Sequence, residues 1–162
     1  MLRNTLLPLA VIACVLPAQA QQPAEPVKTE VANIADLTQQ AQGLLAKARA
    51  ESGSEGITLG LYNHHKTMLT ARAHSGGAEL HAHFADFLLV LDGEGTELIG
   101  GTILNRTDGP DGESKGTQLE GAVPHPLRKG DILHIPAGTP HQAIEAPGQS
   151  IALYVIKVQE SN

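Results

Sequence analysis

Apolar side chains recur at intervals of three and four residues between positions 30 and 50. The stripe consists of Val31, Ile34, Leu37, Ala41, Leu44, Leu45 and Ala48. This spacing predicts an amphipathic helix from Glu30 to about Ala50, because residues three and four apart share one helical face. We expect the apolar face to pack on the outside of the domain or on a partner subunit, and Gly53 and Gly56 to end the helix.

From residue 57 onward the apolar period changes to two, which is typical of β-strands. The alternation predicts strands over residues 57–62, 67–72, 79–83, 87–91, 96–104, 132–135, 142–145 and 151–158. Residues 92–95, Asp-Gly-Glu-Gly, are typical of a hairpin turn, and residues 105–116 predict a long loop. Many short strands with Gly and Pro turns and no helix between them indicate an all-β sandwich or closed barrel.

Length, charge and composition limit the possible functions. The chain has 162 residues, the size of one domain. It carries 11 Lys and Arg against 17 Asp and Glu, a net charge of -6, which argues against nucleic acid or an anionic membrane surface as a partner. Aromatic residues make up 2% of the chain, so we expect no surface that stacks bases or sugars.

Residues 1–20 are typical of a signal peptide. Arg3 precedes an apolar run, residues 6–16, that is short for a membrane span, and Ala18-Gln19-Ala20 fits the pattern that signal peptidase cleaves. We therefore expect an exported protein, periplasmic or extracellular, with no membrane span. Residues 21–56 are expected to form a polar tether and the helix, and residues 57–162 the barrel domain.

Cys14 is the only cysteine and allows a second interpretation of the N-terminus. Residues 11–14, Val-Ile-Ala-Cys, resemble a lipobox, which would make the protein a lipoprotein anchored through Cys14. If cleavage instead follows Ala20, the mature chain has no cysteine, and hence no disulfide and no thiolate. A metal site would then use only nitrogen and oxygen ligands.

Histidines carry the strongest chemical signal in the sequence. His81 and His83 lie two apart on an expected strand, so both side chains point to one face, which Glu79 shares. A His-x-His pair alone is more typical of two solvated side chains. His141 changes this interpretation, because residues 136–140, Pro-Ala-Gly-Thr-Pro, form a tight turn that would hold its imidazole in a fixed place.

The region before His141 resembles the second sequence motif of the cupin family. That motif is Gly, five residues, Pro-x-Gly, two residues and His; Gly130, Pro136, Gly138 and His141 match it position for position. Glu145 stands where the motif usually has Asn.

The first cupin motif is His-x-His, three or four residues, Glu, six residues and Gly. Asp86 and residue 93 fit its second half, with Asp in place of Glu, and two registers compete for the first half. In one register His81 and His83 are the His pair, which leaves two residues before Asp86. In the other the usual spacing is kept, and Glu79 and His81 take the His positions. We favour Glu79, His81, Asp86 and His141 as ligands, because a barrel tolerates a substitution more readily than a deletion in a strand ladder; His83 is the alternative to Glu79.

The resemblance covers roughly residues 57–158 and implies a cupin-type jelly-roll β-barrel with one N-terminal amphipathic helix. It implies one divalent transition metal ion, Mn, Fe, Ni, Zn or Cu, on histidine and carboxylate side chains. The function expected from it is a small metalloenzyme of dioxygenase, isomerase or lyase type that acts on a small polar molecule able to chelate the metal. The general base would be whichever of Asp86, Glu79 or His83 is not coordinated.

Two further expectations stay open at this point. The alternative function is a non-catalytic cupin module that binds a small molecule or a metal, because one fold hosts both kinds of protein. We also expect a homodimer, because the outer strands of such barrels often pair and the amphipathic helix needs a surface to cover.

Overall fold

The amphipathic pattern near the N-terminus forms helix α1, Ile34–Ala50, in the computed structural model, which describes residues 30–160. The helix begins later than expected because Asn33 is its N-cap: the Asn33 side chain accepts a hydrogen bond from the backbone N–H of Ala35 at 2.8 Å. The expected signal peptide and lipobox lie outside the described residues. Within those residues, no helix has the length and apolar character needed to cross a membrane.

The remainder of the described chain is largely β-structure, as the period-two pattern predicts. The strands are β1 (Ser54–Leu61), β2 (His65–Arg72), β3 (Ala78–His81), β4 (Phe84–Ile99), β5 (Thr102–Leu104), β6 (Thr107–Asp108), β7 (Glu113–Gly116), β8 (Gln118–Glu120), β9 (Val123–Arg128), β10 (Ile132–Ile135), β11 (His141–Ile144) and β12 (Ser150–Gln159). A short 3-10 helix, η1 (Pro110–Gly112), precedes β7.

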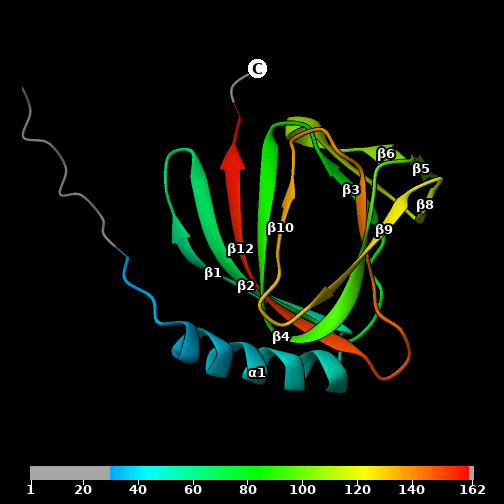
Figure 1. Cartoon of the computed structure of the whole chain (residues 1–162). Helices are drawn as coiled ribbons and strands as arrows, with labels where there is room; N and C mark the ends of the chain where they lie inside the picture. The colour runs from blue at the N-terminus through cyan, green and yellow to red at the C-terminus, as the bar shows by residue number, and fades with distance from the viewer. Residues whose placement is uncertain (1–29, 161–162) are drawn as a thin grey trace, which may run out of the picture.

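Most of these strands form one antiparallel sheet that curves into a barrel (Figure 1). Its order is β1-β2-β12-β4-β11-β3-β7-β6, and β9 and β10 also pair with β4. Strands β5 and β8 form a separate pair. Helix α1 lies across the barrel wall, against β1, β2, β4 and β12. The all-β barrel with one N-terminal helix is therefore confirmed.

The barrel wall separates two apolar clusters because alternate residues of each strand point to opposite faces. On the helix side, Leu37, Ala41, Leu44 and Leu45 of α1 pack on residues of β2, β4 and β12 that include Leu69. Inside the barrel, a second cluster consists of Leu88, Val90, Leu127, Ile135, Ile151, Leu153 and Val155. The helix thus packs on the outside of its own domain, and the barrel interior remains available for polar groups at one end.

The expected hairpin at residues 92–95 is wrong. These residues lie inside β4, which continues without a turn from Phe84 to Ile99. Gly93 has a φ of 78° and lies beside a bulge in the pairing of β4 with β12. A Cβ at Gly93 would collide with the carbonyl oxygen of Ser150, so the glycine allows β4 to bend while β12 stays paired. The bent strand pairs with β10 in its first half and with β9 and β11 in its second.

The expected loop at residues 105–116 also proves to be structured. It contains β6, η1 and β7, and β7 pairs with β3 through four residue pairs from Ala78–Gly116 to His81–Glu113. The Gly-, Asp- and Pro-rich composition accounts for the turn at η1. The pairing with β3 is a long-range contact, which local composition does not reveal.

Candidate metal centre

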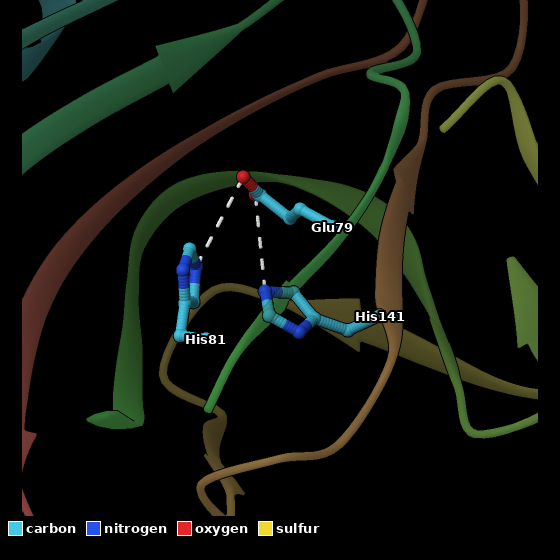
Figure 2. Close-up of side chains that lie close together, drawn as sticks. All are labelled: Glu79, His81 and His141. Carbon is cyan, nitrogen blue, oxygen red and sulfur yellow. Dashed lines mark ion pairs between the residues drawn. The ribbon is translucent and has the colours of Figure 1, made fainter. Parts of the chain in front are cut away.

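Two neighbouring strands bring Glu79, His81 and His141 together at one end of the barrel interior. Glu79 and His81 belong to β3, His141 begins β11, and Glu79 is the direct partner of His141 in the antiparallel pairing. One ligand atom from each residue lies within 4.8 Å of the others. Figure 2 shows the Glu79 carboxylate facing both imidazoles, with Glu79 Oε1 at 3.8 Å from His141 Nε2 and Glu79 Oε2 at 4.0 Å from His81 Nε2.

The imidazole of His141 is oriented by the turn that precedes it. Its Nδ1 lies 3.0 Å from the carbonyl oxygen of Thr139, which can only accept a hydrogen bond. Burial lowers the pKa of His141 below its ordinary value, so the ring is neutral near pH 7. The ring proton is therefore on Nδ1, and Nε2 presents its lone pair to the cluster.

The imidazole of His81 is oriented in the same way by a carboxylate. Its Nδ1 donates to Glu113 Oε2 on the neighbouring strand β7 at 2.5 Å. Its Nε2 is buried and has no hydrogen-bond partner among residues 30–160. A buried nitrogen without a partner is unfavourable unless something binds it. The histidine, its carboxylate acceptor and the free Nε2 together match the arrangement that holds metal-ligating histidines in proteins.

Asp86 lies next to these three residues, but its carboxylate forms an ion pair with Lys157. Its Oδ2 is 3.8 Å from His81 Nε2 and 3.9 Å from His141 Nε2. The Nζ of Lys157 donates to both carboxylate oxygens of Asp86, at 2.8 Å and 2.6 Å. Asp86 and Lys157 are direct partners in the pairing of β4 with β12, so the strand register itself builds this ion pair. Asp86 is thus within reach of the centre, with its charge already balanced.

Solved structures share this arrangement of strands. The chain resembles BH2720 of Bacillus halodurans, with 21% identity, a TM-score of 0.53 and coverage of 86% of this chain and 85% of that one. It resembles the DMSP lyase DddQ of Ruegeria pomeroyi DSS-3, with 16% identity, a TM-score of 0.50 and coverage of 74% of this chain and 54% of the lyase. The cupin domain of Schizosaccharomyces pombe Cnp3 matches with 9% identity, a TM-score of 0.49 and coverage of 66% and 61%. This is the cupin fold. No protein-family model and no curated protein matches the sequence.

The cupin motifs lie in the structure as follows. Glu79, His81 and His141 form the compact group, and Asp86 stands beside it with Lys157. His83 lies elsewhere, because β3 ends at His81 and residues 82–83 form a turn in which His83 is exposed. The expectation that residues 79, 81 and 83 share one face therefore does not hold at its last position: the alternation stops where the strand stops.

A cavity of about 220 Å³ opens beside the three side chains. Its walls are aliphatic, with Leu88, Ile135 and Val155 among them, and its polar lining includes Arg72 and Glu97 in addition to the residues already described. Sequence reasoning did not single out Glu97, Glu113 or Lys157. Glu97 and Lys157 each lie two positions from an apolar residue of the interior cluster, Ile99 and Val155, which was the available signal. Glu113 has no such neighbour, and only the strand register shows that it meets the candidate metal centre.

Glu97 is a buried carboxyl group without a hydrogen-bond partner in the described part of the chain. It is 5% exposed. Burial raises the pKa of Glu97 to about 8, and the nearby positive charge of Arg72 opposes this shift without cancelling it. Glu97 is therefore mainly protonated near pH 7 and acts as a neutral O–H donor that faces the cavity.

The raised pKa of Glu97 predicts how the stability of the metal-free protein changes with pH. Between pH 4.5 and about 8 the unfolded chain has released the Glu97 proton while the folded protein keeps it, so the free energy of unfolding falls as pH rises. The substitution Glu97→Gln removes this dependence. Between pH 4.5 and about 8, we expect the free energy of unfolding of the variant to rise relative to that of the wild type by about 1.4 kcal/mol per pH unit. Urea denaturation with a chelator present measures this difference.

The matched control is Glu120→Gln, which changes an exposed carboxylate of β8. Its stability should follow the wild-type pH profile. Parallel profiles for the wild type and Glu97→Gln would show that Glu97 is already ionised in the folded protein and would contradict the prediction.

Proposed function

We propose that this cupin is a metal-dependent enzyme in which Glu79, His81 and His141 hold one divalent transition metal ion beside the small cavity. The observation that carries the proposal is the Nε2 atom of His81, which is buried, free of any hydrogen-bond partner within residues 30–160 and aimed at the same point as His141 and Glu79. Two nitrogens and one carboxylate oxygen suit Mn, Fe, Ni, Zn or Cu.

Three protein ligands leave coordination positions for water or a substrate oxygen, and a metal in such a site supplies Lewis-acid or redox chemistry. The chain's own groups fix the geometry. Thr139 and Glu113 hold the two imidazoles by their Nδ1 atoms, and the aliphatic walls of the cavity limit the water that reaches the site. Asp86, which Lys157 holds in place through both carboxylate oxygens, is the group we propose as the proton acceptor for a bound substrate.

A small chelating molecule fits this cavity better than a large one. Its volume of about 220 Å³ corresponds to roughly seven water molecules. A reaction of lyase, isomerase or dioxygenase type on such a molecule is in keeping with the fold, which the chain shares with a DMSP lyase.

The alternative is a non-catalytic cupin that binds a small molecule or sequesters a metal. One observation favours it: both oxygens of Asp86 accept hydrogen bonds from Lys157, which weakens Asp86 as a base. An enzyme would turn over a chelating substrate in the metal-loaded state, whereas a binding module would bind it unchanged.

We further propose export to the periplasm or the extracellular space, on the basis of the signal-peptide pattern in residues 1–20. Expression of the full chain in a Gram-negative host, followed by fractionation and intact mass measurement, should give periplasmic protein that begins at Gln21. A protein lipidated at Cys14 would instead be found in the membrane fraction, and uncleaved protein in the cytoplasm would contradict export.

We also propose a homodimer, in keeping with the exposed edge strand β1 at one end of the main sheet. Size-exclusion chromatography with light scattering should give twice the mass of one chain. A single-chain mass over the whole concentration range would contradict the dimer.

The metal site itself is tested by elemental mass spectrometry on untagged protein after incubation with each candidate ion. We expect about one metal equivalent in the wild type and little in His81→Ala or His141→Ala, because each substitution removes one of three ligands. His125→Ala removes an exposed histidine of β9 and should keep the metal.

A wild type that takes up none of the ions would overturn the metal-dependent function. Loss of metal in His125→Ala as well as in the two ligand variants would place the binding on surface histidines and would equally contradict the site.

A further inference from the structure

The cavity extends beyond the three candidate ligands to a second pair of polar groups, Arg72 and Glu97. Arg72 is the last residue of β2, and Glu97 lies in the second half of β4. Both line the same cavity as Glu79, His81 and His141. Two chemical groups therefore face one small space: the candidate metal centre, and a guanidinium with a carboxyl beside it.

The guanidinium of Arg72 has unused hydrogen-bond donors. Its Nη2 is 4.0 Å from Glu79 Oε1, which is an ion-pair distance and too long for a hydrogen bond. Its side chain donates no hydrogen bond to any other residue in the range 30–160. A guanidinium has five N–H donors in a planar fork that matches a carboxylate. Arg72 thus presents a charged, unsatisfied donor set to the cavity.

The guanidinium of Arg72 lies close to the backbone of Gly76. A Cβ at Gly76 would lie 2.7 Å from Arg72 Nη1, closer than real Cβ contacts come. The side chain of Arg72 is 28% exposed, so most of it is enclosed. A glycine at this point makes room for the planar end of the arginine.

The charges that line the cavity do not balance once a divalent ion is bound. Lys157 neutralises Asp86, so Glu79 and Glu97 are the two remaining carboxyl groups of the cavity lining. Even with both ionised, their two negative charges would not balance the two charges of a divalent ion and the one of Arg72. Uncompensated charge in an enclosed site is costly, so the surplus of positive charge favours an anionic ligand.

We propose that Arg72 and Glu97 form a carboxylate-binding subsite, and that the ligand of this cupin is a short acid with one chelating end and a second carboxylate at the other. The chelating end, a carboxylate with a neighbouring oxygen, faces the ligands of the metal. The second carboxylate accepts two N–H hydrogen bonds from Arg72 and one O–H hydrogen bond from Glu97. This inference rests on the proposed metal site, since the chelating end needs an ion.

Two probes of similar size distinguish binding to the subsite from binding to the metal alone. Malate has a 2-hydroxycarboxylate end and a second carboxylate, whereas 2-hydroxybutyrate has the same chelating end with a methyl group instead. We expect metal-loaded wild type to bind malate about 10-fold or more tightly than 2-hydroxybutyrate in isothermal titration calorimetry, in line with charged hydrogen bonds to one carboxylate.

The deciding variant is Arg72→Met, which keeps length and removes the charged fork. It should hold the metal, bind 2-hydroxybutyrate like the wild type and lose the preference for malate. Arg72→Lys keeps the charge but not the fork, so we expect an intermediate preference. Arg106→Met is the matched control: Arg106 pairs with exposed Asp108 outside the cavity, and its loss should leave the preference unchanged.

The outcomes separate this inference from the metal site. Metal uptake by the wild type with equal affinity for the two acids would overturn the subsite and leave the metal site intact. A preference for malate that survives in Arg72→Met would place the second carboxylate on the metal and also overturn the subsite. If Arg72→Met fails to fold, the wild-type comparison and Arg72→Lys still decide. Failure of the wild type to bind metal refutes the proposed function itself.

Discussion

The alternation of side chains along strand β12 is the constraint on which the rest of this structure depends. This strand lies between β2 and β4, and its side chains point alternately to the helix side and to the barrel interior. Ala152 is part of the cluster under α1, whereas Leu153 and Val155 are part of the interior cluster. A slip of one residue would exchange the two faces, so helix packing and interior packing together fix the register.

The same register determines the surroundings of the candidate metal centre. Lys157 is inward-facing two positions after Val155, and its direct partner on β4 is Asp86. An acidic residue that would otherwise be an obvious ligand is therefore held as half of an ion pair. Three ligand candidates remain in a compact group, and a balanced charge pair stands beside them. The other charged or titratable groups of the cavity are Arg72, Glu79 and Glu97.

The sequence predicted the helix, most strands and the close approach of His81 and His141, because these depend on periodicity and on the short spacing of the cupin motifs. It did not predict the features that depend on which strands become neighbours. Residues 92–95 have turn composition, yet β12 and β9 keep them in an extended strand. Glu113 lay in an expected loop, yet it meets His81 because β7 pairs with β3. His83 was expected to share the face of Glu79 because local sequence does not show that β3 ends at His81.

The hydrogen bond between Glu113 and His81 has a thermodynamic consequence for the outer part of the barrel. Glu113 begins β7, directly after η1, at the edge region that also includes β6. An ion bound to Nε2 of His81 would strengthen the hydrogen bond from Nδ1 to Glu113 and so would favour the docked state of this segment. Because such coupling is reciprocal, whatever orders or displaces the segment changes the affinity of the centre by the same factor. The rim of the barrel and an ion bound at the candidate metal centre would thus form one linked equilibrium.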